Sequence, residues 1–599
     1  GASGINISAA SIRTTGTQTY QQAVQFTGTD TTLRTLEAST LSFSGAVQAN
    51  NHDLTLKADT FVFGGAASIQ GSPGFGGTQT LTIATQTASR TIGLSGGAGD
   101  LQLPLDQVQD FDRLVVGDSS GTGQITVGLS GGGANIDFGD VTITSGTGNI
   151  VIDAAMGSDM FPLSNLTLST GGITRVNGVE IYADNLVFNG AVVLGQNLDS
   201  LSYTTTVRGN QLVFNGSVDG DVAGAAVLDT MDVNLTRFEG AVGSTQSLQE
   251  ILTNDVELGS SITASSLIQF SGNVSLFDDT SLTAPTINLG GGASTLNASD
   301  VNGDYSLALR SDTLNTLLGP INGGNELTLA PLDNARAIVV GNGLGLGQLV
   351  IDSATLARFS GFQQITVGSA TLGTGDITIG DGFFTDLVLP TSLRAQSLSG
   401  DITVSQAISG NHNLSLSTSG QIRIERDLGG TSGLTALSSL SVEGNATLAL
   451  SGNQTLRTSG SQTYTGAVNL GSNANLIGAS VRLQGSVDGA SSLAITTTGN
   501  TRLDGEVGGS TRLTQLSINA ASIDLHDGSV NTTGNQAYAG TTTLHTDTTL
   551  SSLGGQVALN GAVQGVSNGG QALVIAAPQA ISSQSVGTTG TRLKSLTTT

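Results

Sequence analysis

Histidine is the first residue type to consider for chemistry, because its imidazole can bind a metal ion or transfer a proton near neutral pH. The chain contains four histidines, His52, His412, His526 and His545. None of them has a second ligand at the short spacing typical of zinc sites. We therefore predict polar residues at the corners of a repeating fold, with a metal or proton site as the alternative.

Aspartate is the next residue type, because Ca²⁺ is bound by about six to eight oxygen atoms, several of them from carboxylates. The calcium candidates lie together in one short segment and are Asp106, Asp110, Asp112 and Asp118. Further aspartates gather at residues 219–232 and at Asp278 and Asp279. We predict that these groups form a solvated acidic surface, and calcium binding is the alternative.

A catalytic group is not indicated by the sequence. Polysaccharide-degrading enzymes can use parallel β-helices, but hydrolysis requires two carboxylates that face each other at a set distance. No Walker loop and no dinucleotide-binding glycine pattern occurs after a predicted strand. The chain also lacks cysteine, and it has no tryptophan to stack on a sugar. We predict a protein that is not an enzyme and has no catalytic or cofactor-binding residues.

The composition narrows the choice of fold and partner. The chain has 599 residues, 37% of them hydrophobic and 11% charged, with 85 glycines and a formal net charge of −25. This hydrophobic content is enough for a packed core, and no apolar run approaches the roughly 18 residues of a membrane span. The negative charge argues against binding to nucleic acid, whose phosphates would be repelled.

A short repeated motif indicates how the chain is organised. An aromatic residue or leucine is followed by any residue, glycine, a small or polar residue and valine, as in residues 43–47 and 188–192. The motif returns at Phe214, Phe238, Phe270, Tyr464, Leu483, Leu503 and Leu559. Within the two clusters of copies, at residues 188–270 and 464–503, neighbouring copies are 19 to 32 residues apart, which suits one coil of a solenoid. Between them, aliphatic residues alternate with threonine or serine, as in β-strands that bury one face.

Longer repeats accompany this motif. Thr-Gly-x-Gln-x-Tyr, or a close variant, occurs at residues 15–20, 459–464 and 533–538. A Val-Gly or Leu-Gly pair starts at Leu428, Val507 and Val586, at intervals of 79 residues. Apolar residues spaced by three, at Leu105, Val108 and Phe111 and again at Leu356, Phe359 and Phe362, predict a short helical turn before a strand pair. Because the last Val-Gly element could be completed by the first Thr-Gly-x-Gln-x-Tyr unit, we expect the chain to be one period of a longer tandem array or an excerpt from one.

These motifs together resemble the repeat regions of filamentous-haemagglutinin-like and related strand-repeat adhesins of bacteria. The resemblance rests on the Phe-x-Gly-Ala-Val, Thr-Gly-x-Gln-x-Tyr and Val-Gly units, and it covers nearly the whole chain. It implies a right-handed parallel β-helix that is secreted to the cell surface, where it forms a rod that serves as a stalk, adhesin or fibre subunit. It implies no catalytic residues.

The sequence therefore predicts an all-β fold, a right-handed parallel β-solenoid of roughly 22–30 coils that forms an elongated rod. Residues 1–599 are expected to form one continuous repeat region, with possible sub-blocks 1–90, 91–180, 181–300, 301–400 and 401–599. The expected function is structural, in an extracellular or cell-surface adhesin or fibre. The expected partners are other copies or adjacent repeats of the same protein, without nucleic acid or membrane insertion. A module that binds host or surface glycans is the main alternative, ahead of an ice-binding or polysaccharide-degrading β-helix.

Overall fold

The computed structural model of this chain is a parallel β-solenoid of about 24 turns, which confirms the predicted fold class. The structure describes residues 4–599 except 37, 66, 73–77, 129–137, 199, 291–294, 300–302, 317–320, 342–347, 381–386, 431–434 and 449–452. About 1% of the chain is helical. The described residues contain no helix with the length and apolar character needed to span a bilayer.

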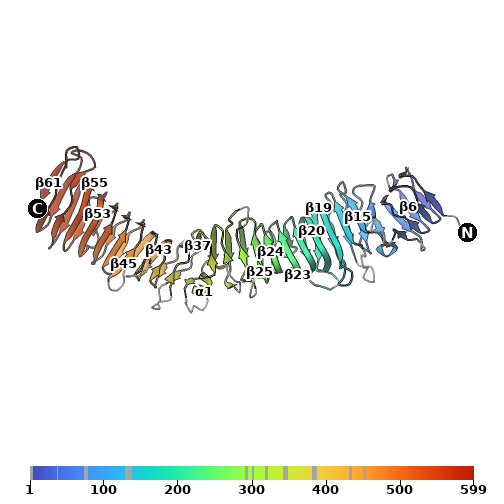
Figure 1. Ribbon diagram of the computed structural model, residues 1–599, viewed down its shortest axis with the longest axis horizontal. Coiled ribbons are helices and arrows are strands. Elements are labelled where there is room, and N and C mark those ends of the chain that lie inside the picture. Colours follow the sequence, from blue (N-terminus) through green and yellow to red (C-terminus); the bar gives the residue numbers. More distant parts are fainter. Residues whose placement is uncertain are drawn as a thin grey trace. The chain divides into compact units, whose positions relative to one another are not determined.

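The chain divides into two compact units. The first, called the N-terminal unit, comprises Gly1–Leu307 with Leu314–Gly319, and the second, the C-terminal unit, comprises Ala308–Thr313 with Pro320–Thr599. The predicted continuous repeat region with its sub-blocks stays a prediction. Figure 1 shows the strands of each unit as successive parallel rungs, from β6 (Thr40–Phe43) to β25 (Ile262–Phe270) and from β37 (Gln364–Ser369) to β61 (Ser595–Thr598).

Parallel pairing between strands about one coil apart builds the N-terminal unit. Strand β20 (Glu180–Gly195) pairs with β21 (Thr204–Phe214), and β21 pairs with β23 (Val227–Phe238), all in parallel register. In these three strands, buried residues largely alternate with more exposed ones. The predicted alternation of aliphatic and hydroxyl residues therefore places one face of each strand in the core.

The Phe-x-Gly motif marks a column of stacked rings beside a column of glycines. Phe188, Phe214 and Phe238 stack at centroid distances of 4.9 and 5.3 Å and are at most 2% exposed. The glycine that follows each ring lies against the backbone of the coil below: a Cβ atom added to Gly216 would come within 2.3 Å of the Gly190 carbonyl. The motif thus combines a core ring with a position at which only glycine fits.

The Thr-Gly-x-Gln-x-Tyr motif forms a buried polar network at a coil corner. Tyr538 Oη donates to Gln536 Oε1 at 2.9 Å, and Gln536 Nε2 donates to the carbonyls of Val530 at 3.1 Å and Ser551 at 2.8 Å. The earlier copies repeat this arrangement with Gln462 and Tyr464 and with Gln18 and Tyr20. The glutamine therefore links its own coil to the next one, while the tyrosine holds the amide in place.

A short helical turn lies at the start of each apolar triplet, as the 3₁₀ helix η1 (Leu105–Gln107) and the α-helix α1 (Ser353–Leu356). The second residue of each triplet, Val108 or Phe359, already lies in a strand. The glycines of the 79-residue element, Gly429, Gly508 and Gly587, all have φ between 71° and 78°. This left-handed backbone is favourable for glycine and strained for other residues, and it allows the sharp turn at each corner.

Many aspartates hold one coil to the next. Asp488 Oδ1 accepts hydrogen bonds from the backbone N–H groups of Ser510 at 2.8 Å and Thr511 at 3.0 Å, 22 and 23 residues further along the chain. Asp219 makes the same pair of bonds to Thr245 and Gln246. Single bonds of this kind are made by Asp53, Asp255, Asp279, Asp376, Asp401, Asp427 and Asp547. Much of the acidic surface therefore consists of carboxylates that cap backbone donors of the neighbouring coil.

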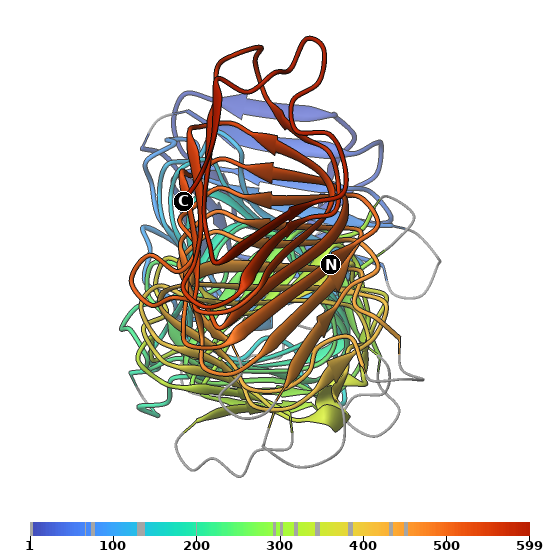
Figure 2. The same cartoon turned by 90° about the vertical axis from the view of Figure 1, so that its left-hand side faces the viewer.

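The C-terminal unit follows the same plan. Strand β53 (Gln515–Leu525) pairs with β55 (Gln536–Leu544) over both of its halves, with one register shift between Asn519 and Ser522. Figure 2 faces these last coils and shows their strands lying one above another. Residues at equivalent positions of successive coils therefore form straight columns, both inside the core and on the surface.

Candidate functional site

A shallow polar groove crosses four strands of the C-terminal unit. It has a volume of about 560 Å³ and lies over β45 (Gln454–Arg457), β48 (Ala474–Gly478), β51 (Ser492–Thr497) and the start of β53. The lining side chains that face outward are amides, hydroxyls and one alanine methyl, from Asn453, Thr455, Asn473, Asn475, Ser492, Ala494, Gln515 and Ser517. None of the lining residues is charged or aromatic. The groove suits a neutral, hydrogen-bonding ligand.

Parallel register explains this groove. Thr455, Asn475, Ala494 and Ser517 occupy one row across the four strands. At its edge, Asn473 Nδ2 donates to Asn453 Oδ1 at 3.0 Å, and Asn473 Oδ1 accepts from the Ser492 N–H at 2.9 Å. The asparagines are therefore partly used in holding neighbouring coils, and the rest of their hydrogen-bonding capacity faces the groove.

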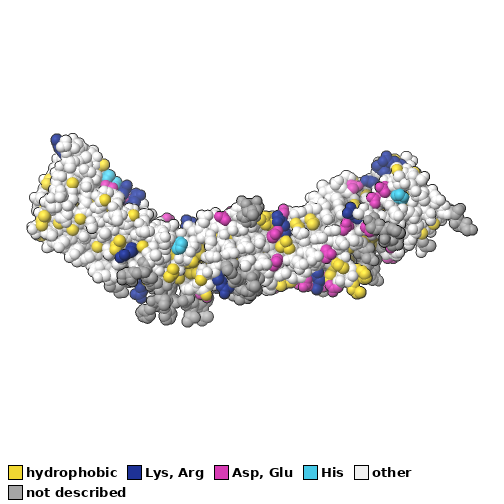
Figure 3. Space-filling view, in the orientation of Figure 1, with side chains coloured by type: hydrophobic (Ala, Val, Ile, Leu, Met, Phe, Trp, Pro, Cys, Tyr) yellow, Lys and Arg dark blue, Asp and Glu magenta, His cyan; other side chains and the backbone are white. Residues whose placement is uncertain are grey.

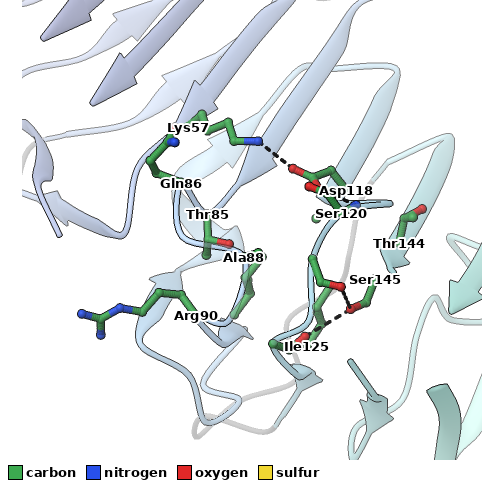
Figure 4. Close-up of a pocket in the computed structure, with 14 residues that line it drawn as sticks. Lys57, Thr85, Gln86, Ala88, Arg90, Asp118, Ser120, Ile125, Thr144 and Ser145 are labelled. Atoms are coloured by element: carbon green, nitrogen blue, oxygen red, sulfur yellow. Dashed lines mark hydrogen bonds and ion pairs between the residues drawn. The ribbon is translucent and has the colours of Figure 1, made fainter. Parts of the chain in front are cut away.

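A second pocket lies in the N-terminal unit and is too small for a substrate. Its volume is about 20 Å³, which is room for one water molecule. Figure 4 shows Lys57 and Asp118 pointing toward each other across it, with Lys57 Nζ 2.7 Å from Asp118 Oδ2. Burial alone would raise the pKa of Asp118, but hydrogen bonds from Lys57 and Ser120 outweigh it and lower the pKa to about 2. The pair is a stable ion pair between coils, not an acid or base poised near neutral pH.

The four calcium candidates have different surroundings. Asp118 takes part in the Lys57 ion pair, and Asp112 Oδ2 accepts from the Gln79 N–H at 2.8 Å. Asp106 lies exposed in η1, and Asp110 is exposed with a φ of 61°. Among the described residues, no group of three or more converging metal-ligand atoms includes any of these four. Calcium binding at this segment stays a prediction.

The histidines do lie at coil corners, but two of them come together. His526 directly follows β53 and His545 directly follows β55, and their rings stack with centroids 3.6 Å apart and an angle of 17° between the planes. Asp524 lies beside them, with Oδ1 3.5 Å from His545 Nε2. One potential ligand atom from each of the three residues lies within 4.8 Å of the other two. No zinc-like spacing marks this group in the sequence, because the two histidines are a whole coil apart.

The face of the molecule drawn in Figure 3 is mostly neither charged nor hydrophobic. Charged side chains occur there in small groups, in keeping with a chain in which 11% of residues are charged. Ion pairs between neighbouring coils include Arg208 with Asp232 and Arg237 with Glu257. These charges therefore serve contacts within the solenoid.

No family model, no curated protein and no solved structure matches this chain.

Proposed function

We propose that this protein is a structural, non-catalytic β-solenoid of a secreted or cell-surface bacterial adhesin or extracellular fibre. The observation that supports this proposal most directly is that backbone pairing and side-chain contacts continue from coil to coil through each unit. From β19 (Leu163–Asn177) to β25, the long strands β19, β20, β21, β23, β24 and β25 form an unbroken series in which each pairs in parallel with the next. Such stacking distributes a load over many hydrogen bonds.

The sites described above favour a scaffold over an enzyme. The small pocket holds an ion pair whose carboxylate has its pKa lowered to about 2, whereas a general acid or base works best with a pKa near the working pH. The large groove presents only amides, hydroxyls and aliphatic groups. These features contribute to packing and surface polarity, as expected for a stalk or fibre segment.

Self-association is part of this proposal. Parallel pairing continues from coil to coil as far as β59 (Ala572–Ala576) and β61. The same pairing allows a strand edge to accept a parallel strand from another copy or from an adjacent repeat of the same protein. We propose that the protein acts in an end-to-end array of such repeats.

Electron microscopy of the purified chain, at several concentrations and without a partner, tests the proposal. Filaments with an axial repeat of about 4.8 Å that grow with concentration would identify a fibre subunit. Separate rods would identify a stalk segment. A globular particle without this repeat would contradict both forms of the proposal.

Glycan binding by the polar groove is a second candidate function. The groove is within the volume range of about 300–1,000 Å³ found for small-ligand sites, and its neutral amides and hydroxyls match the chemistry of sugar hydroxyls. A glycan array comparing the wild-type chain with Asn475→Leu tests it, with the exposed Thr514→Leu as a control outside the groove. Binding that is lost only in Asn475→Leu would support this function, and equal binding by both variants would contradict it.

A further inference from the structure

We propose that Asp524, His526 and His545 form a binding site for a divalent transition-metal ion. The ion would belong to the class that imidazole and carboxylate ligands bind together, such as Zn²⁺, Co²⁺, Ni²⁺ or Cu²⁺. The inference is independent of the structural role proposed above and rests on the geometry of one corner of the C-terminal unit.

Backbone register brings the two imidazoles together. Leu525 at the end of β53 is paired with Leu544 at the end of β55. The next residue of each strand is a histidine, and the His526 and His545 N–H groups donate to the carbonyls of Leu503 and Leu525 at 2.9 and 2.8 Å. Both histidine backbones are therefore fixed in the same column, one coil apart.

The donor atoms are close enough to converge on one ion. In zinc sites, nitrogen and oxygen ligands lie about 2.0–2.2 Å from the metal, so that ligand atoms stand roughly 3–3.5 Å apart. His545 Nε2 is already 3.5 Å from Asp524 Oδ1, and the three-atom group spans at most 4.8 Å. The rings are stacked, so binding requires at least one imidazole to turn about χ2 and aim its nitrogen at the shared point.

His526 has an unused ligand atom. Its Nε2 is buried and has no hydrogen-bond partner among the described residues. A buried polar atom without a partner is unfavourable, and a bound metal would supply the missing partner.

The surrounding residues assign the carboxylate ligand. Asp504 precedes His526 in the same column, but it is held by Arg482 at 2.8 Å and by Arg502 at 2.5 Å. Asp524 is held differently, because Asn500 Nδ2 donates to its Oδ2 at 2.9 Å and leaves Oδ1 toward the histidines. A hydrogen bond to the far oxygen of a ligating carboxylate orients it for the metal. Two nitrogens and one oxygen favour the borderline transition metals over Ca²⁺ and Mg²⁺, which take oxygen ligands.

Titration of the metal-free full-length chain with Zn²⁺ by calorimetry, and with Co²⁺ by visible absorption, tests the site. We expect one equivalent to bind and to produce Co²⁺ ligand-field bands. His526→Gln and His545→Gln should each weaken binding by at least about tenfold. His412→Gln is the matched control, because His412 belongs to no such ligand group among the described residues, and it should bind as the wild type does.

Circular dichroism of each variant shows whether the coils remain folded. Asp524→Asn provides a second test, because it keeps the side-chain shape but replaces the charged ligand, and it should also weaken binding. Failure of the wild-type chain to bind either ion would overturn the proposal. Binding that survives both histidine substitutions in folded protein would overturn it as well.

Discussion

Replacing the tyrosine of the buried glutamine–tyrosine pair in the C-terminal unit should destabilise the wild type but stabilise a variant that lacks the glutamine. A double-mutant cycle at Gln536 and Tyr538 measures this change of sign. Tyr538 is 1% exposed and Gln536 is fully buried. Tyr538→Phe fills nearly the same volume but removes the hydrogen bond of 2.9 Å and leaves Gln536 Oε1 without that donor. A buried polar group left unpaired costs about 1–3 kcal/mol, so we expect a loss of about 1.5 kcal/mol in the free energy of unfolding.

Gln536→Leu should be more damaging. It removes the amide donor to the carbonyls of Val530 and Ser551 and also leaves the Tyr538 hydroxyl without its acceptor. Two lost hydrogen bonds at about 1 kcal/mol each, with one orphaned hydroxyl, give about 3–4 kcal/mol. Adding Tyr538→Phe to this variant removes the orphaned hydroxyl. The second substitution should therefore restore about 1 kcal/mol, although it destabilises the wild type.

Urea unfolding followed by circular dichroism and tyrosine fluorescence measures this cycle, since the chain has no tryptophan. Repeat proteins can unfold in parts, so hydrogen exchange of peptides covering residues 530–551 should report the local change. Tyr182→Phe is the control, because the partly exposed Tyr182 hydroxyl bonds to Glu180 and its loss should change stability by less than about 0.5 kcal/mol. Equal destabilisation by Tyr538→Phe in both backgrounds would refute the proposed network.

Three further predictions concern the contacts between coils. Asp488→Ala should lower the free energy of unfolding by about 1 kcal/mol, and Asp488→Asn, which keeps an acceptor for the N–H groups of Ser510 and Thr511, should recover most of this loss in urea titrations. Burial raises the pKa of Tyr464 and Tyr538 above the ordinary value of 10.0, so the stability they contribute is complete below pH 10.0 and is lost as the pH rises above it. Their tyrosinate absorbance should therefore appear together with the loss of β-sheet dichroism, and earlier ionisation in folded protein would contradict their burial. Gly216→Ala places a methyl group against the Gly190 carbonyl and should lower the melting temperature. Gly569→Ala is the control, because its methyl group meets no atom within 4 Å although φ is 69°. It should therefore lower the melting temperature less, by the cost of backbone strain alone.

The fold could be predicted because its rules are local. Alternation of aliphatic and hydroxyl residues marks a strand with one buried face, and the spacing of Phe188, Phe214 and Phe238 gives the length of a coil directly. The helical turn at Ser353–Leu356 was predictable only in part, since Leu356 is its last residue whereas Phe359 lies in the next strand. These features depend on a few neighbouring residues and one repeat distance.

The role of the repeated glutamine was not predictable in the same way. The motif identified Gln462 and Gln536 as recurring residues, but an amide beside a tyrosine on an alternating strand could face either solvent or core. Their burial follows from the carbonyls of a second coil, those of Ile477 and Ser551, which lie 15 residues further on. Sequence shows that such a residue recurs, and only the stacked coils show what it contacts.

The histidine pair shows what limits prediction of sites in a solenoid. Metal-site patterns rely on ligands that are close in sequence, whereas here the distance that matters is one coil. His526 and His545 are 19 residues apart, the same spacing as Tyr464 and Leu483, which also lie in register. Coil length varies elsewhere, for example 24 residues from Phe214 to Phe238, so equal spacing becomes informative only after the strands on both sides are aligned. Leu525 and Leu544 are paired strand ends, and the residues that directly follow them lie side by side in one column. The search for ligands in such chains therefore extends from local motifs to whole columns.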